Sequence, residues 1–340
     1  MAVALVALSI VISACGSSSD SSTASESSSS ETTAPESTTA SDPGEESGGS
    51  KAIGIIDVEE ADPLNQATIK GIENAAEAAG WGPVKVTNTK GNADLANSSM
   101  RTYANEGVGM IIDMAWPVEA IGEGLKAAEE KNIPIGGWGS GLAPGILYSS
   151  TDAEGPLMAG YLAEEMKGGG DVLALFYQGG QLCRERQADF EKTVATIPGM
   201  NVEKQELTIP GELELASKFT TAWLAKHPKG SGDLGIWACW DTPMYGALSV
   251  LKSQERDDVI TVSGNGGEQA IREVKDGFLS AEAWEDGVEE GEIVFNETKK
   301  GIEAGSSWKP KAEAITQAAL LVTKDNVDEF LKEHPGAAGE

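Results

Sequence analysis

From residue 51 onward, short apolar runs alternate with longer amphipathic stretches, and this alternation constrains the fold more than any other feature. The run 52–56, AIGII, carries no polar side chain, which is typical of a strand buried on both faces. It is followed by Asp62 and Pro63, a good N-cap residue and a proline at the first helical position. A strand followed by a helix, repeated, predicts a parallel sheet covered by helices.

The alternation continues to the end of the chain. Further strands are predicted at 84–86, 110–112, 133–135, 145–148, 172–177, 201–207, 234–238, 259–262 and 279–283, with helices between them. Residues 314–322 form a predicted last extended segment before a terminal helix at 324–334. Two successive five-strand windings predict an α/β fold of two Rossmann-like lobes, each with a parallel sheet. The length of 340 residues also favours two lobes over one core.

The first fifteen residues have a different character. Residues 2–14 are apolar except for two Ser, a length that suits a signal peptide and is too short to span a bilayer. The run ends in Ile12-Ser13-Ala14-Cys15, which resembles the lipobox of bacterial lipoproteins. This resemblance implies that residues 1–15 are a signal peptide with a lipobox and that Cys15 is lipidated. No Lys or Arg precedes the run, so the true start codon stays open.

The next segment, residues 16–50, is rich in small polar residues. It contains 19 Ser or Thr, seven acidic residues and no basic residue. Such a composition offers no large apolar side chain to bury and therefore cannot offset the entropy lost on ordering. We expect residues 16–50 to be a disordered tether between a membrane anchor and the folded part.

The charge and the scarcity of reactive side chains exclude several function classes. A formal charge of −29, from 25 Lys+Arg and 54 Asp+Glu, disfavours binding to nucleic acid. Two His and three Cys leave little for a metal site, and we expect none. The sequence lacks a nucleophile elbow, an H-E-x-x-H motif, a C-x-x-C motif and a Walker loop. We therefore predict no enzyme activity, no catalytic residues and no cofactor.

Several segments then point to one family by their order and spacing. They are 53–56, 66–73, 132–135, 183–190 (CRERQADF), 241–247 (DTPMYGA), 262–266 (VSGNG) and 321–327. Together they resemble the type I periplasmic binding proteins of the ribose/galactose class, the solute-binding components of ABC importers. The resemblance implies three crossings between the lobes, near 148–152, 284–287 and 309–315. The expected lobes are therefore 51–150 plus 286–312 and 151–285 plus 313–340.

The resemblance also implies a function and a location. The chain is expected to be a bacterial lipoprotein on the outer face of the cytoplasmic membrane, acting as a monomer. It would capture a small ligand between its lobes and deliver it to the permease and ATPase subunits of an ABC transporter. An alternative is a sensory receptor that presents its closed form to a membrane signalling protein. The sequence does not separate transport from sensing.

Ligands of open α/β sheets bind at the carboxyl ends of the strands, so the candidate ligand-binding residues follow the predicted strands. They are Glu59, Asn65, Trp116, Trp138, Ser140, Tyr177, Arg184, Trp240, Asp241, Asn265 and Trp284. A Trp face offers apolar area to a sugar ring, and a guanidinium offers a planar contact to neighbouring oxygens. Four of these choices have a plainer alternative: hinge packing for Trp116 and Trp284, a solvated loop for Glu59, and a helix cap or ion pair for Arg184.

Departures from the family pattern bear on the ligand. Where the family has Asp-Arg, Asn, Asp and Gln, this chain has Gly139-Ser140, Trp240, Asn265 and Trp284. The predicted site is thus more aromatic and less polar than a simple pentose site. This favours a derivatised sugar, a cyclic polyol or another ring compound over a free monosaccharide. A cation held by Trp and carboxylates is the other option left open.

The two remaining cysteines form a candidate disulfide. Cys183 follows the first strand of the second lobe, and Cys239 ends the third. These strands are neighbours in a Rossmann-like winding, so both thiols are expected at one end of the sheet, near the cleft. An exported protein lies in a compartment that permits the bond. The alternative is two reduced, buried cysteines that pack as small apolar residues.

Overall fold

The computed structural model describes residues 50–305, 314–316 and 318–339, which form two lobes with a six-stranded sheet each. The α/β fold of two largely parallel sheets is therefore as predicted. The predictions for residues 1–15, and for the tether apart from Ser50, lie outside the described residues. No helix in the described part of the chain is long and apolar enough to cross a membrane.

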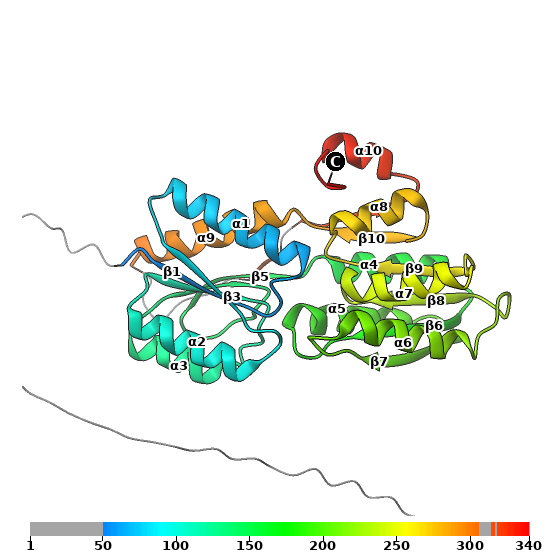
Figure 1. Cartoon of the computed structure of the whole chain (residues 1–340), viewed down its shortest axis with the longest axis horizontal. Helices are drawn as coiled ribbons and strands as arrows, with labels where there is room; N and C mark the ends of the chain where they lie inside the picture. The colour runs from blue at the N-terminus through cyan, green and yellow to red at the C-terminus, as the bar shows by residue number, and fades with distance from the viewer. Residues whose placement is uncertain (1–49, 306–313, 317, 340) are drawn as a thin grey trace, which may run out of the picture. The chain divides into compact units, whose positions relative to one another are not determined.

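The N-terminal lobe is a parallel sheet between two pairs of helices. The strand order is β11-β5-β4-β3-β1-β2, with β1 (Ile53–Asp57), β2 (Val84–Asn88), β3 (Met110–Met114), β4 (Ile135–Trp138), β5 (Ile146–Thr151) and β11 (Ala314–Thr316). The helices are α1 (Pro63–Ala78), α2 (Ala93–Glu106), α3 (Gly122–Glu130) and α9 (Gly287–Glu303). In Figure 1, α1 and α9 lie over one face of the sheet and α2 and α3 over the other. Because helices cover both faces, β1, β3 and β4 are buried along their whole length.

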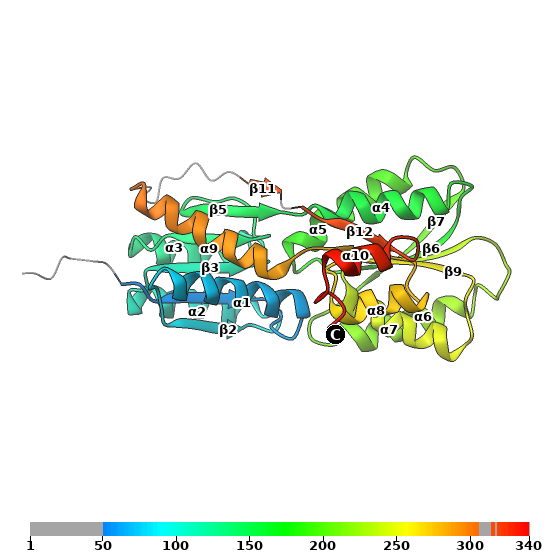
Figure 2. The same ribbon diagram turned by 90° about the horizontal axis from the view of Figure 1, so that it is seen from above.

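The C-terminal lobe repeats this winding. Its strand order is β12-β10-β9-β8-β6-β7, with β6 (Gly170–Phe176), β7 (Met200–Glu206), β8 (Leu234–Ala238), β9 (Val259–Ser263), β10 (Ala281–Trp284) and β12 (Leu320–Thr323). The helices are α4 (Glu154–Glu165), α5 (Gln181–Val194), α6 (Glu212–Leu224), α7 (Asp241–Ser253), α8 (Glu268–Asp276) and α10 (Val327–Glu333). Figure 2 shows α4 and α5 on one side of the sheet and α6 and α7 on the other. All strand pairs are parallel except β10 with β12.

The first strand and helix of each lobe occupy equivalent places. Strand β1 lies between β2 and β3, and β6 lies between β7 and β8. Helix α1 follows β1, as α5 follows β6. The loops β1–α1 and β6–α5 are therefore equivalent, and both lie at the carboxyl ends of central strands, where the winding rule places a ligand.

The last crossing between the lobes lies later than the sequence predicted. Residues 314–316 pair with Ser149–Thr151 as β11, so they belong to the N-terminal sheet and not to a C-terminal lobe of 313–340. Strand β12 pairs with β10 in the other sheet. The predicted single extended segment 314–322 is thus two short strands in two sheets. Strands of three and four residues carry too little pattern to reveal a change of sheet between them.

Candidate functional site: the cavity between the lobes

A small cavity lies between the two lobes at the carboxyl ends of their strands. We call it the interlobe cavity; its volume is about 50 Å³. The lining residues are Val58, Glu59, Asp62, Asn65, Ala115, Trp138, Tyr177, Gly180, Leu182, Cys183, Arg186, Ile209, Trp240 and Asn265. A space of this size holds a few water molecules and no sugar ring. The lobes are therefore closed on each other around a collection of aromatic, aliphatic and hydrogen-bonding side chains.

The structure brings six of the predicted ligand-binding residues together in this wall. They are Glu59, Asn65, Trp138, Tyr177, Trp240 and Asn265. The other five predicted residues, Trp116, Ser140, Arg184, Asp241 and Trp284, are not among the lining residues. Strand ends thus located the cavity, whereas the direction of individual side chains decided which residues reach it.

Three of these five residues are buried and bonded within their own lobe. The indole N–H of Trp116 donates to Thr89 Oγ1 at 3.1 Å. The Ser140 hydroxyl lies 3.2 Å from that of Ser149. A carboxylate oxygen of Asp241 accepts from the Tyr245 hydroxyl at 2.7 Å and from the Gly267 amide at 2.9 Å. Because burial desolvates the Asp241 carboxylate, its pKa is raised to about 7.

Trp284 lies at the second crossing between the lobes. Its ring centroid is 4.5 Å from His334 and 5.0 Å from Phe330, so it packs against the C-terminal helix. It lines a second cavity, of about 900 Å³, together with Asn265, the start of α1, the start of α8 and the chain after α10. The arrangement matches the hinge-packing alternative stated for this residue.

The structure places Arg186, and not Arg184, in the wall of the interlobe cavity. The Arg184 side chain is 40 % exposed and donates from Nε to the carbonyl of Gln178 at 2.7 Å. Arg186 is buried and lines the interlobe cavity. Two residues apart on a helix point to nearly opposite faces, so only one of the two arginines could face the cleft. Arg184, which was predicted to bind ligand, is therefore not a lining residue of the cavity, whereas Arg186 is.

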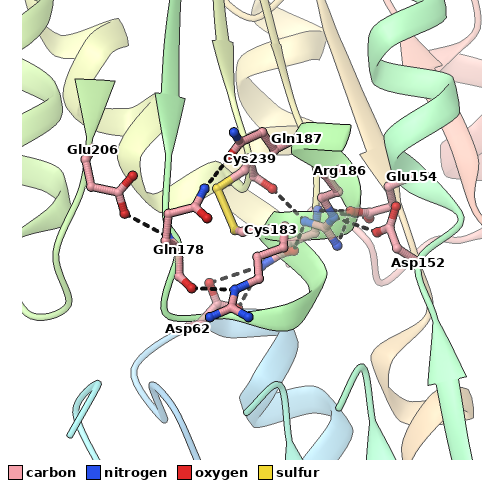
Figure 3. The surroundings of a disulfide bond; sticks show 11 residues. Asp62, Asp152, Glu154, Gln178, Cys183, Arg186, Gln187, Glu206 and Cys239 are labelled. Carbon is pink, nitrogen blue, oxygen red and sulfur yellow. Dashed lines mark hydrogen bonds and ion pairs between the residues drawn. A yellow bond between two sulfur atoms is a disulfide. The ribbon is translucent and has the colours of Figure 1, made fainter. Parts of the chain in front are cut away.

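The Arg186 guanidinium is held on several sides (Figure 3). Its Nε donates to Asp152 at 2.6 Å, and its Nη2 lies 2.6 Å from Glu154. Its Nη1 donates to the carbonyl of Cys239 at 2.7 Å and to Oδ1 of Asn265 at 2.8 Å. Two carboxylates thus compensate a buried charge whose desolvation would otherwise be costly. The arrangement fixes the plane of the guanidinium against one wall of the cavity.

Asp62 links the two lobes. As the N-cap of α1, its carboxylate accepts from the amides of Leu64 and Asn65 at 2.9 and 3.4 Å. The same carboxylate accepts from the amide group of Asn265, in the other lobe, at 3.2 Å to each oxygen. Asn265 also accepts from Arg186, so a continuous chain Asp62–Asn265–Arg186 crosses the cavity. Burial raises the pKa of Asp62, and the amide and Asn265 donors oppose that shift.

Aromatic rings form the remaining walls. Tyr177 and Trp240 follow β6 and β8, and their ring centroids are 5.9 Å apart. Trp138 ends β4 in the opposite lobe, and its indole N–H donates to the Glu290 carboxylate on α9. Since burial desolvates the phenol, the pKa of Tyr177 is raised to about 12, so the hydroxyl is a neutral donor at ordinary pH. The cavity therefore combines flat apolar faces with fixed polar groups.

Behind the N-terminal wall lie two buried carboxyl groups at adjacent strand ends. Burial raises the pKa of Asp57 to about 7 and that of Asp113 well above its ordinary value. Asp57 accepts from the side-chain amide of Asn65 at 2.8 Å, which orients Asn65 in the cavity wall. Within the described residues, no group of three or more His, Cys, Asp or Glu is placed to hold a metal ion.

The structure joins Cys183 and Cys239 in a disulfide, with Cα atoms 5.5 Å apart. This separation lies within the range that the bond requires. Cys183 lies in the first turn of α5 and lines the interlobe cavity, and Cys239 follows β8 directly. The candidate bond of the sequence analysis thus lies in the wall of the site.

Several lining residues were not predicted from the sequence, Leu182 and Arg186 among them, and Asp62 was predicted as a helix cap alone. For the residues of α5, the spacing of apolar positions in the sequence could have indicated which side chains face inward. The buried positions Leu182, Cys183, Arg186, Phe190 and Val194 recur at helical spacing, which places Arg186 on the inner face of the helix. No sequence signal shows that the α1 cap also meets the other lobe, because that contact depends on how the surfaces of the two lobes come together.

Comparison with known proteins now adds to this geometry. Residues 53–305 match the family model described as periplasmic binding protein domain. No curated protein matches the chain. A solute-binding protein of an ABC transporter from Agrobacterium vitis, solved with bound allitol, has a TM-score of 0.74 at 21 % identity, covering 84 % of this chain and 99 % of that one. The myo-inositol binding protein of Caulobacter has a TM-score of 0.72 at 17 % identity, covering 82 % and 95 %.

A third solved structure is the 5-methylthioribose transporter solute-binding protein from Thermotoga lettingae, solved in complex with 5-methylthioribose. Its TM-score is 0.73 at 16 % identity, covering 85 % of this chain and 92 % of that one. At these identities the solved structures establish the two-lobed fold. The family match spans most of the chain and assigns it to a class of extracytoplasmic binding proteins, not of enzymes. This chain belongs to the periplasmic binding protein family.

Proposed function

We propose that this protein captures a small polyhydroxylated compound, a polyol or a sugar-like ring, in the interlobe cavity and delivers it to an ABC transporter. The observation that carries the proposal is the polar chain Asp62–Asn265–Arg186 between the rings of Trp138, Tyr177 and Trp240. A carboxylate, an amide and a guanidinium can accept and donate to neighbouring hydroxyl groups. Aromatic faces suit the C–H faces of a ring.

Ligand entry requires the lobes to separate. With the lobes closed, Asn265 forms hydrogen bonds with both Asp62 and Arg186, and the cavity of about 50 Å³ is too small for a sugar. On opening, the Asp62–Asn265 contact breaks and both groups become available. A polyol would then replace that direct contact with hydrogen bonds to its own hydroxyl groups as the lobes close over it.

The similar solved structures support this ligand class. These proteins were solved with allitol, myo-inositol and 5-methylthioribose bound, two of them polyols and one a derivatised sugar. The N-terminal Cys15 motif supports attachment by a lipid to the outer face of the cytoplasmic membrane. A tethered receptor would keep its ligand close to the permease and ATPase that it serves.

The test is calorimetric titration of the purified protein with allitol, myo-inositol and 5-methylthioribose. We expect saturable binding of at least one of them, and an affinity about 30-fold lower or worse for Trp240→Ala, because it removes an aromatic anchor. Trp223→Phe is the matched control, since Trp223 is buried in α6 against His227. Binding by no member of the set, or equal affinity in the Trp240→Ala protein, would contradict the proposal.

A further inference from the structure

The disulfide and Arg186 connect the same two segments of the C-terminal lobe. Cys183 and Arg186 are three residues apart on α5, so they lie on one face of the helix. The disulfide joins Cys183 to Cys239, and Arg186 Nη1 donates to the carbonyl of that same Cys239 at 2.7 Å. One covalent link and one hydrogen bond therefore tie the first turns of α5 to the residue after β8 (Figure 3).

The first turn of α5 is not secured by a capping side chain. Gly180 is the N-cap residue, and no side chain caps the first amides of the helix. The preceding loop, Gln178-Gly179-Gly180, contains two glycines. The amide of Gln181 donates to the carbonyl of Ala115 at 3.0 Å, but Ala115 belongs to the other lobe, so this bond exists only when the lobes are closed. When they open, the disulfide remains as the covalent restraint on this turn, beside the bonds of Arg186 to Asp152 and Glu154 and of Glu185 to the Asp152 amide.

We propose that the Cys183–Cys239 disulfide is a positioning element of the binding site, which holds the start of α5 so that Arg186 keeps its orientation while the lobes are open. The inference rests on the proposed function, because the orientation of Arg186 affects binding only if a ligand reaches it. A site that is already ordered loses less conformational entropy when a ligand binds to it. The disulfide therefore raises affinity without contacting the polar groups of the ligand.

Arg186 itself stays charged and partnered without the bond. Asp152 and Glu154, which lie at the first crossing and the start of α4, hold its Nε and Nη2. Loss of the disulfide frees the helix start and the Cys239 carbonyl, so the guanidinium pivots about its carboxylate partners. The expected loss of affinity is about tenfold, smaller than the loss on removing an anchor residue.

The first arm of the test needs no ligand. Amide hydrogen exchange is compared between the unliganded wild type and the Cys183→Ser/Cys239→Ser protein. We expect exchange about tenfold faster at Arg184, Glu185 and Arg186, with no change at the equivalent first turns of α1. Unchanged exchange in the first turns of α5 would overturn the proposal, whatever the ligand proves to be.

The second arm uses whichever of allitol, myo-inositol and 5-methylthioribose binds the wild type. The double Ser variant should bind about tenfold more weakly, whereas Val194→Ala, at the far end of α5, should lower the melting temperature and leave the affinity within about twofold.

In an Arg186→Lys background, removing the disulfide should cost little further affinity, because both changes act on one group. Equal affinity of the double Ser variant, or full additivity with Arg186→Lys, would overturn the proposal. Failure of all three compounds to bind would count against the proposed function alone and leave the exchange result to decide this one.

Discussion

The two lobes start their first helices at equivalent places but secure them by different chemistry. In the N-terminal lobe, Asp62 caps α1 through hydrogen bonds to Leu64 and Asn65. In the C-terminal lobe, α5 has no side-chain cap and is joined to the end of β8 by the Cys183–Cys239 disulfide. The first attachment depends on a carboxylate and the second on an oxidised pair of thiols. The two walls of one cavity should therefore respond to different perturbations.

The two lobes also carry different side chains at the ends of their equivalent central strands. The N-terminal lobe ends β1 with Asp57 and places Asp113 in β3, both buried, whereas Tyr177 and Cys239 follow the equivalent strands β6 and β8. Buried carboxyl groups hold protons that depend on pH, and an aromatic ring with a disulfide does not titrate in the ordinary range. The pKa of Asp241, which follows Trp240 in the C-terminal lobe, is also raised to about 7, so pH acts on both walls, whereas the redox state acts on the C-terminal wall alone.

The largest expected effect concerns the C-terminal wall. Arg186→Gln leaves Asp152 and Glu154 buried without their cation, which should lower the free energy of unfolding by about 3–5 kcal/mol. Arg184→Gln, two residues earlier and half exposed, should change it by about 0.5 kcal/mol or less. Urea unfolding of the two variants measures the difference. Similar values for both would mean that the buried ion pairs do not hold this lobe together.

The next effect is that of reduction. Opening the disulfide, with a dithiol as the electron donor, relieves a constraint on a loop spanning 56 residues of the unfolded chain. Stability should fall by about 2–4 kcal/mol. Thermal unfolding with and without the dithiol measures it, and the Cys183→Ser/Cys239→Ser protein, which should not respond to the dithiol, is the control. If the dithiol does not change the thermal unfolding of the wild type, the disulfide does not stabilise the C-terminal lobe.

The pH effect on the N-terminal wall is expected to be smaller. The pKa of Asp57 rises from an ordinary value of 3.8 to about 7 on burial, so the folded protein binds this proton more tightly than the unfolded chain. The stabilisation is therefore complete below about pH 4 and is lost as the pH rises through about 7. Between about pH 5 and pH 8 the wild type should lose about 1–3 kcal/mol more than Asp57→Asn. Parallel stability curves for the two proteins would refute this assignment.

The smallest effect is expected at the helix cap. Asp62→Ala removes the acceptor for the first amides of α1 and should cost about 1 kcal/mol, whereas Asp62→Asn keeps an acceptor oxygen and should cost less. Denaturant midpoints of both variants provide the measurement. If Asn is as harmful as Ala, the charge that Asp62 presents to Asn265 matters more than the cap.

The sequence predicted the fold well because the central strands are largely buried and mostly apolar, and the helices carry an apolar face towards the sheet. It placed Trp138, Tyr177, Trp240 and Asn265 correctly at strand ends. The sequence did not show which of Arg184 and Arg186 reaches the cavity, because the prediction followed the family motif and not the face of the helix on which each residue lies. The role of Asp62 between the lobes depends on how the lobes meet, and no local pattern in one lobe encodes the surface of the other.

The central claim is that the lobes must separate to admit a ligand and then close over it. Pulsed electron resonance between spin labels attached through non-natural residues at Leu95 in α2 and Leu213 in α6, both exposed and on different lobes, tests it directly. Without ligand, we predict a broad distance distribution with a component longer than the closed structure allows. A saturating polyol should collapse it to one narrow, shorter peak. A single unchanged peak, in the presence of ligand binding confirmed by calorimetry, would contradict the account.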